Sequence, residues 1–258
     1  FYPEPRPVMA DLVLDAAVGD VGKFYAGKFQ PSALIAGAWE ARDHFPQFPG
    51  GGRWLFFTAA PLNGANGHVI GAVETLQDIS EQKSYEARLE SLARHDLLTG
   101  LPNRTVLDER LQWAFSQAAR DGRLIALAFL DLDRFKPIND EMGHAAGDAV
   151  LCELARRLTA AVRDVDTVAR VGGDEFVVVL WSPDSLEAVE GVVRRIITTV
   201  SQPMEVAGRD VQVGCSIGIA LYPAHGTDQG SLLSRADAAM YLAKAAGRNG
   251  YCVHSPPP

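Results

Sequence analysis

Two carboxylates close a strongly apolar stretch of the sequence. The run 124–132 (LIALAFLDL) has the length of a buried strand, and Asp131 and Asp133 stand at its end. Alternation places these two side chains on one face of the strand and Leu132 on the other. A carboxylate at the end of a buried strand is costly unless it has a partner, and Mg²⁺ prefers such oxygen ligands. The pair is therefore either a set of solvated strand-end acids or part of a metal site.

A second acidic pair follows a glycine turn. Gly172 and Gly173 supply the positive φ angles of a tight hairpin between two apolar strands, and Asp174 and Glu175 come next. When this hairpin lies beside the strand that ends at Asp131, the acids of both segments form one oxygen-rich site for Mg²⁺. A purely structural turn is the alternative.

The segment 135–148 (FKPINDEMGHAAGD) is rich in polar groups, and we predict a loop that leads into a helix. Lys136 can meet a phosphate as a point charge, while Asn139 and Asp148 offer the donors and acceptors that match a guanine edge. For Asp148 the alternative is an acid that complements the helix dipole. For His144 the alternative is an ordinary loop histidine.

Composition limits the class of protein. The chain has 258 residues, enough for two domains of about 100–200 residues each. Its 47% hydrophobic and 22% charged residues are typical of a globular protein and argue against disorder. A net charge of −8 argues against a nucleic-acid polymer as partner, because such binders carry a basic surplus. It does not exclude a nucleotide bound through a divalent cation.

The elements that must position these residues alternate after residue 96. Hydrophobic periodicity predicts strands at 124–132, 167–171, 176–181, 211–222 and 251–254, and helices at 105–120, 148–163, 185–201 and 232–246. This order gives a β-α-β-β-α-β core, an α+β layout with a central antiparallel sheet and flanking helices. Upstream, strands at 53–60 and 68–79 form a hairpin, and a charged helix with a narrow apolar seam begins at Ser80.

Four segments in a fixed order resemble the GGDEF-domain diguanylate cyclases. They are 96–104 (DLLTGLPNR), 131–148, 170–176 (RVGGDEF) and 240–249 (MYLAKAAGRN). The resemblance covers residues 96–254, and none of its motifs departs from the active pattern. It implies a palm-like fold related to the nucleotide cyclases. It also implies condensation of two GTP molecules into cyclic di-GMP with release of two pyrophosphates.

The resemblance assigns the acidic residues to metal binding and catalysis. Asp131, the backbone carbonyl of Leu132 and Asp174 would hold Mg²⁺, with Mn²⁺ as an alternative ion. Asp174 would also assist deprotonation of the attacking 3′-hydroxyl. Glu175 would complete the acidic pair, with a share of the metal binding or the proton transfer.

The same resemblance positions the nucleotide. Asn139 and Asp148 would bind the guanine, and His144 would belong to the same GTP site. Three cations would neutralise the triphosphate and the charge that develops on phosphorus. They are Lys136, which we also count as catalytic, Lys244 and Arg248.

The segment 163–166 (RDVD) matches an RxxD pattern, with five residues between its aspartate and Gly172. This is where the family's inhibitory site lies, so Arg163 and Asp166 would bind cyclic di-GMP and slow the enzyme. Arg194, on the following helix, stands where a second arginine of that site can come from. A surface salt bridge is the alternative.

The N-terminal region resembles the closing part of a PAS domain joined to an output domain. The matching segments are 54–62 (WLFFTAAPL) and 71–83 (GAVETLQDISEQK). We therefore expect a PAS-like sensory domain over 1–80, whole or truncated, whose ligand the sequence does not identify. A linker helix over 81–95, the GGDEF domain over 96–254 and the start of a further linker over 255–258 follow it.

Two functions remain open at this stage. One is an active, product-inhibited diguanylate cyclase that needs a homodimer, because two GTP sites must face each other, and that the PAS-like domain regulates. The other is a non-catalytic module that binds GTP or cyclic di-GMP and controls an attached domain such as a phosphodiesterase.

The sequence contains no run of 18 apolar residues that would span a membrane. The chain begins at Phe1 instead of Met, which indicates a fragment. We expect a bacterial cytoplasmic location, with room for a membrane anchor in segments upstream of the fragment.

Overall fold

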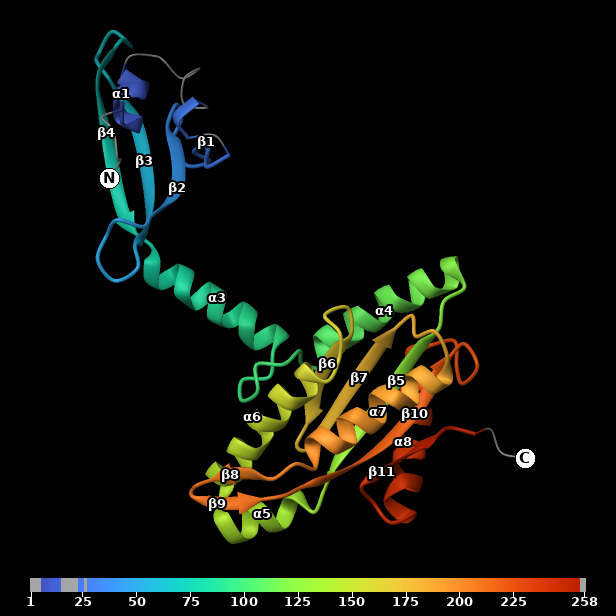
Figure 1. Ribbon diagram of the computed structural model, residues 1–258. Helices are drawn as coiled ribbons and strands as arrows, with labels where there is room; N and C mark the ends of the chain where they lie inside the picture. Colours follow the sequence, from blue (N-terminus) through green and yellow to red (C-terminus); the bar gives the residue numbers. More distant parts are fainter. Residues whose placement is uncertain (1–5, 15–22, 26, 256–258) are drawn as a thin grey trace. The chain divides into compact units, whose positions relative to one another are not determined.

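The computed structural model describes residues 6–14, 23–25 and 27–255. It divides into two compact units, residues 1–90 and 91–258, and the division falls inside helix α3 (Ser80–Arg94) (Figure 1). Residues 256–258 of the predicted C-terminal linker lie outside the described residues. No helix in the described part of the chain is long and apolar enough to cross a membrane.

The N-terminal unit is a four-stranded antiparallel sheet whose order follows the chain. Its elements are α1 (Met9–Leu14), β1 (Phe29–Pro31), β2 (Trp39–Phe45), β3 (Arg53–Asn63) and β4 (Val69–Asp78). Helix α1 packs on β3 and β4, and Met9, Tyr25 and Phe57 are buried in the small core of this unit. The pairing of β3 with β4 confirms the predicted hairpin.

The C-terminal unit is built on a five-stranded sheet of order β11-β10-β5-β7-β6. Its strands are β5 (Ile125–Asp133), β6 (Thr167–Gly172), β7 (Glu175–Trp181), β10 (Gly214–Tyr222) and β11 (Gly250–Val253). Its helices are α4 (Arg104–Asp121), α5 (Phe135–Met142), α6 (His144–Ala160), α7 (Leu186–Val200) and α8 (Gln229–Ala245). The predicted β-α-β-β-α-β order is confirmed. The sheet is mixed instead of wholly antiparallel, because α8 is a crossover helix that returns β11 parallel to β10.

Helices cover both faces of this sheet. Ile125 and Leu127 of β5 belong to the cluster formed with α4 and α8, while Ala126 and Ala128 belong to the cluster formed with α6 and α7. Strand β5 is therefore buried on both sides, which explains why its sequence is continuously apolar. The same burial leaves its last acidic residues at the edge of a hydrophobic core.

Two segments differ from the prediction. The segment 135–148 is not a loop: it contains α5 and the start of α6, separated at Gly143, whose φ is 85°. Pro137 lies in the first turn of α5, where a missing N–H breaks no helical hydrogen bond. The predicted strand 211–222 is divided, because the hairpin of β8 (Met204–Val206) and β9 (Arg209–Val211) precedes β10.

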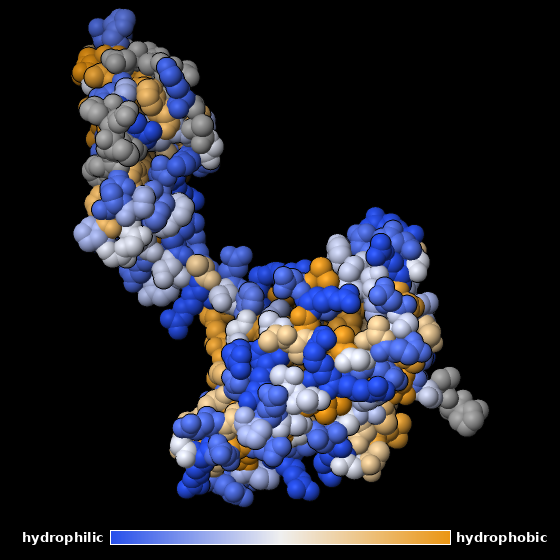
Figure 2. Space-filling model, in the orientation of Figure 1, coloured by the Kyte–Doolittle hydropathy of each residue, from blue (hydrophilic) through white to orange (hydrophobic). Residues whose placement is uncertain are grey.

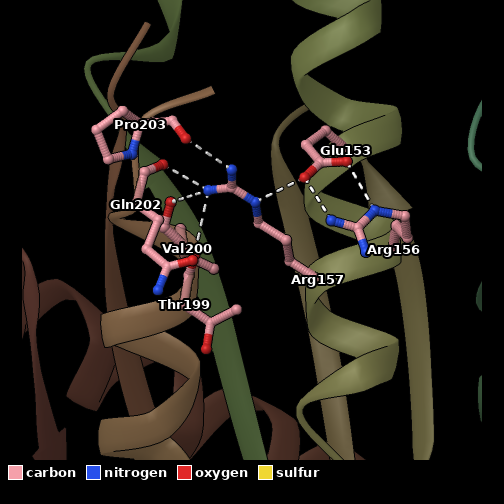
Figure 3. Close-up of polar contacts among 7 residues, drawn as sticks. All are labelled: Glu153, Arg156, Arg157, Thr199, Val200, Gln202 and Pro203. Atoms are coloured by element: carbon pink, nitrogen blue, oxygen red, sulfur yellow. Dashed lines mark hydrogen bonds and ion pairs between the residues drawn. The ribbon is translucent and has the colours of Figure 1, made fainter. Parts of the chain in front are cut away.

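Arg157 ties α6 to the end of α7 (Figure 3). The residue is 7% exposed, and its guanidinium donates hydrogen bonds to four backbone carbonyls. These are Thr199 at 3.1 Å, Val200 at 3.2 Å, Gln202 at 2.5 Å and Pro203 at 3.0 Å. Its Nε donates to Glu153 at 2.8 Å. One buried cation therefore satisfies the carbonyls at the C-terminal end of α7.

We expect Arg157→Leu to lower the free energy of unfolding by about 3 kcal/mol, because it leaves these carbonyls without their donor. Urea denaturation at 25 °C measures this loss. Arg156→Leu is the matched control, since Arg156 also binds Glu153 but its side chain is 69% exposed. Its loss should stay below about 0.5 kcal/mol. If both variants lose the same free energy of unfolding, the hydrogen bonds from Arg157 to the carbonyls are not what stabilises this end of α7.

Candidate active site

The two acidic segments meet where β5 ends and β7 begins. These strands pair antiparallel, with Asp131 opposite Glu175 in register. Asp174 occupies the turn just before β7. The expectation that the glycine hairpin lies beside β5 is confirmed, and the acids of both segments gather at one end of the sheet.

Negative charge exceeds positive charge at this end of the sheet. Burial raises the pKa of Asp131, and the charge of Asp174 raises it further. Lys244 on α8 opposes this shift, with its Nζ 2.6 Å from Asp131 Oδ1. Burial also raises the pKa of Glu175, as do the charges of Asp131 and Asp174. Within the described residues, Lys244 is the one ion-pair partner of these three acids.

The donor set suits a divalent cation. Asp131, Asp174, Glu175 and the carbonyl of Leu132 offer hard oxygen ligands of the kind that Mg²⁺ and Mn²⁺ prefer. Among the described residues, no three or more acidic, histidine or cysteine side chains lie together as a group that could hold a metal ion by itself. Mg²⁺ needs few protein ligands when phosphate oxygens and water complete its shell. The oxygen donors and the excess negative charge therefore fit a cation that is shared with a nucleotide.

Asp133 has a different role from Asp131, although both stand at the end of β5. Ser216 Oγ donates to Asp133 Oδ1 at 2.8 Å, and the backbone N–H of Asn249 donates to Oδ2 at 2.8 Å. Both oxygens thus hold β10 and the segment after α8 in place. That segment carries Arg248, so Asp133 positions a predicted phosphate-binding residue.

Four of the residues predicted to bind GTP lie at or near the junction of α5 and α6. Asn139 lies against Gly147, where a Cβ atom would stand 1.9 Å from Asn139 Oδ1. His144 and Asp148 are exposed and one helical turn apart on α6, so they share a face. The fourth residue of this junction, Lys136, is exposed on α5.

Several of these predicted ligand-binding side chains have no hydrogen-bond or ion-pair partner among the described residues. In the part of the chain that the structure describes, no side-chain hydrogen bond or ion pair is recorded for Lys136, His144, Asp148 or Arg248. These side chains are exposed and open to a ligand. Lys244 is the exception among the predicted phosphate-binding residues, because it pairs with Asp131.

Sequence reasoning gave no role to Arg170, Asp96 or Asp237. Arg170 Nη2 and Nε donate to the carbonyl of Gly173 at 2.7 and 3.0 Å, and its Nη1 lies 2.8 Å from Asp96 Oδ1. Arg170 therefore fixes the turn immediately before Asp174 and joins it to the 96–104 segment. Asp237 on α8 adds to the charges that raise the pKa of Glu175. Asp96 and Arg170 are the first residues of two of the four family segments, 96–104 and 170–176, and this position could have pointed to them. Nothing in the local sequence marks Asp237.

The RxxD segment forms a tight turn between α6 and β6. Asp166 Oδ2 accepts the backbone N–H of Arg163 at 3.0 Å, and Oδ1 accepts that of Trp181 at 3.0 Å. Arg194 does not join them: its guanidinium contacts the hydroxyl of Tyr251 at 2.9 Å and Glu190 at 3.0 Å. The structure thus brings Arg163 and Asp166 together and places Arg194 with other partners.

Comparison with known proteins assigns the C-terminal unit. The family model "Diguanylate cyclase, GGDEF domain" matches residues 93–250. MucR of Pseudomonas aeruginosa, a bifunctional diguanylate cyclase/cyclic di-GMP phosphodiesterase, is 49% identical over 161 residues, 62% of this chain and 23% of MucR. The diguanylate cyclase TpbB of the same species is 42% identical over 178 residues, 66% of this chain and 41% of TpbB. The cyclic di-GMP phosphodiesterase PdeR of Escherichia coli is 36% identical over 219 residues, 85% of this chain and 33% of PdeR.

Solved structures agree with this assignment. The GGDEF domain of TpbB is 42% identical, with a TM-score of 0.61, and the match covers 62% of this chain and 94% of that one. The coiled coil and GGDEF domain of DgcB from Caulobacter crescentus, solved with cyclic di-GMP, is 29% identical, with a TM-score of 0.61 and coverage of 68% and 93%. The chain spans less than half the length of MucR, TpbB and PdeR. By the extent of the family match and by its fold, the chain belongs to the GGDEF-domain diguanylate cyclase family.

Proposed function

We propose that this chain is an active diguanylate cyclase, which condenses two GTP molecules into cyclic di-GMP and two pyrophosphates. Family membership alone does not decide this, because relatives such as PdeR are named phosphodiesterases. The observation that carries the proposal is the intact acidic site, in which Asp131, Asp174 and Glu175 converge opposite Lys244.

Each residue of the site has a proposed task. Asp131, Asp174, Glu175 and the Leu132 carbonyl would hold Mg²⁺, or Mn²⁺ in its place, which when bound neutralises triphosphate charge. Asp174 assists removal of the proton from the 3′-hydroxyl of one GTP, with Glu175 beside it. The hydroxyl oxygen then attacks the α-phosphorus of the second GTP, and the bond to pyrophosphate breaks. A second, symmetrical attack closes the cyclic product.

The remaining residues of the site bind and orient GTP. Asn139 and Asp148 meet the guanine, and His144 belongs to the same pocket. The cations at the site balance the phosphates and the charge that develops in the transition state. They are Lys136, Lys244 and Arg248.

The reaction needs two copies of the site, so the proposal includes a homodimer. Helix α3 carries an exposed apolar seam of Tyr85, Leu89 and Leu92, which suits pairing between two copies. The N-terminal sheet unit is proposed as a PAS-like sensory domain, with an unidentified ligand, that regulates this pairing. Product binding at the RxxD turn, through Arg163 and Asp166, is proposed to inhibit the enzyme.

Incubation of the purified chain with GTP and Mg²⁺, followed by chromatography of the products, tests the proposal. We expect cyclic di-GMP and pyrophosphate, a specific activity that rises with protein concentration as dimers form, and no product after EDTA is added. The non-catalytic alternative predicts GTP binding without turnover. Absence of cyclic di-GMP from a preparation shown to be dimeric would overturn the proposal.

A further inference from the structure

A cavity of about 570 Å³ lies on the N-terminal unit, over the adjacent strands β1, β2 and β3 (Figure 1). Trp54 and Phe56 of β3 line it, and because they are two residues apart they share one face of the strand. The alternate residues Leu55 and Phe57 belong to the core beneath α1, so the cavity lies on the other face of the sheet. Its volume falls within the range of about 300–1,000 Å³ that is usual for small-molecule sites.

The two rings of this cavity are each paired with a side chain of β2. Arg42 lies opposite Phe56 in register, with its guanidinium carbon 5.4 Å from the centre of that ring. His44 lies opposite Trp54, with ring centroids 5.3 Å apart. A Cβ atom at Gly52 would stand 2.6 Å from His44 Nε2, so the backbone packs closely against the histidine and limits its movement. The cavity therefore has an ordered aromatic wall with a guanidinium beside it.

Two charged groups of the cavity are already paired with each other. Lys28 Nζ lies 2.6 Å from Asp43 Oδ1. Glu40 also lines the cavity, and its Oε1 accepts the hydroxyl of Ser32 at 2.5 Å, which leaves its negative charge without a cation. For the guanidinium of Arg42, no hydrogen bond or ion pair is recorded among the described residues. One acid and one base of the cavity are thus open to a charged ligand.

These two open charges lie on the same strand but do not neutralise each other. Glu40 and Arg42 are two residues apart on β2, so both side chains are on the cavity face, and no ion pair between them is recorded in this described segment. Glu86 of α3 does not neutralise Arg42 either. Its pKa is lowered first by hydrogen bonds from Lys83 at 2.7 Å and Gln82 at 2.9 Å, and last by the charge of Arg42.

Trp54 connects the cavity to the start of α3. Its backbone N–H donates to Ser80 Oγ at 2.9 Å, and its carbonyl accepts the N–H of Ile79 at 2.9 Å. Lys83 Nζ lies 6.0 Å from the centre of its ring. Hydrophilic residues predominate on the surface of α3 in Figure 2, in keeping with these polar contacts. A ligand on the Trp54 ring therefore acts on the first turn of the helix that leads to the GGDEF unit.

We propose that this cavity binds an aromatic α-amino acid, with its carboxylate on Arg42, its ammonium on Glu40 and its ring on Phe56 and Trp54. The proposal rests on the sensory role proposed above for this unit, and it names the class of ligand. A zwitterion meets both open charges at once, whereas a simple anion or cation leaves one of them unmatched. An aromatic side chain matches the wall, because rings pack favourably on rings.

Calorimetric titration of the full chain with L-phenylalanine tests the assignment, with three analogues measured by competition. 3-Phenylpropionate lacks the ammonium, 2-phenylethylamine lacks the carboxylate, and L-alanine lacks the ring. Each should bind about tenfold more weakly or worse, the size expected for one lost charge-assisted contact or one lost buried ring. Equal affinity for L-phenylalanine and all three analogues would overturn the inference, as would no binding of L-phenylalanine.

Two variants separate direct contact from a merely structural effect. Arg42→Gln should weaken L-phenylalanine about tenfold or more but change 2-phenylethylamine less than about twofold, because that ligand has no carboxylate. Glu40→Gln should weaken L-phenylalanine and spare 3-phenylpropionate in the same way. Arg53→Gln is the matched control: Arg53 is also exposed, but it pairs with Asp78 and does not line the cavity. A larger loss in Arg53→Gln than in Arg42→Gln would contradict the assigned contact.

Hydrogen exchange measures the connection to α3. Saturating L-phenylalanine should slow exchange in the first turn of α3, where the N–H of Lys83 donates to the carbonyl of Ile79 at 2.9 Å. Binding with unaltered exchange would overturn this connection. Because these measurements contain no GTP, a chain that binds L-phenylalanine but makes no cyclic di-GMP contradicts only the proposed cyclase activity. A chain that makes cyclic di-GMP without binding L-phenylalanine contradicts only this inference.

Discussion

Asp131→Asn is expected to lower the rate of cyclic di-GMP formation by about a thousandfold or more, while the chain remains folded. Asparagine has the same shape as aspartate but removes the charge that Lys244 contacts at 2.6 Å. It also removes an anionic oxygen from the donor set proposed for Mg²⁺. Initial rates at saturating GTP and Mg²⁺ measure the effect, and circular dichroism checks the fold.

Asp133→Asn is the matched control for this experiment, because it makes the same change on the same strand. The Asp133 oxygens accept hydrogen bonds from Ser216 and Asn249, so its replacement should lower the free energy of unfolding by about 1 kcal/mol. Its rate should stay within about tenfold of the wild type, because Asp133 acts only through the position of the next segment. A larger rate loss in Asp133→Asn than in Asp131→Asn would contradict the division of roles between the two acids.

The pattern of apolar and glycine residues in the sequence was enough to predict the parts of the site that depend on strand order. The continuous apolar run of β5 indicates burial on both faces, and the glycine turn indicates a hairpin. Together with the β-α-β-β-α-β order, these place Asp131 beside Glu175, as the structure shows. Helix α5 was not predicted, because the density of polar groups in 135–148 indicated a loop. In the fold, Pro137 lies in the first turn and Gly143 separates two helices.

Contacts between distant segments could not be derived from pattern. Lys244 was expected at the triphosphate, and its pairing with Asp131 depends on how α8 packs across the sheet. The same holds for Arg170, which reaches both Gly173 and Asp96. The family resemblance suggested Arg194 for the RxxD site, and in the structure its guanidinium contacts the hydroxyl of Tyr251. Side-chain direction is decided by such neighbours, which sequence spacing does not reveal.

Gly218→Ala is expected to lower the free energy of unfolding by about 3 kcal/mol or more. Gly218 lies in β10 where α8 crosses it, and a Cβ atom there would stand 1.9 Å from the carbonyl oxygen of Ala236 and 2.1 Å from the amide nitrogen of Met240. Both are backbone atoms of α8, so a side-chain rotation cannot relieve the overlap. The helix itself must move away from the sheet. Urea denaturation at 25 °C measures the loss.

Gly191→Ala is the control, since Gly191 is inside α7 and a Cβ atom there would meet nothing within 4 Å. Alanine in a helix should raise the free energy of unfolding by about 0.5–1 kcal/mol. Because α8 also carries Lys244, movement of α8 in Gly218→Ala should reduce the cyclase rate of the molecules that remain folded, whereas Gly191→Ala keeps its rate. If Gly218→Ala is destabilised but keeps its cyclase rate per folded molecule, then the contribution of Lys244 to the rate does not depend on the packing of α8 at Gly218.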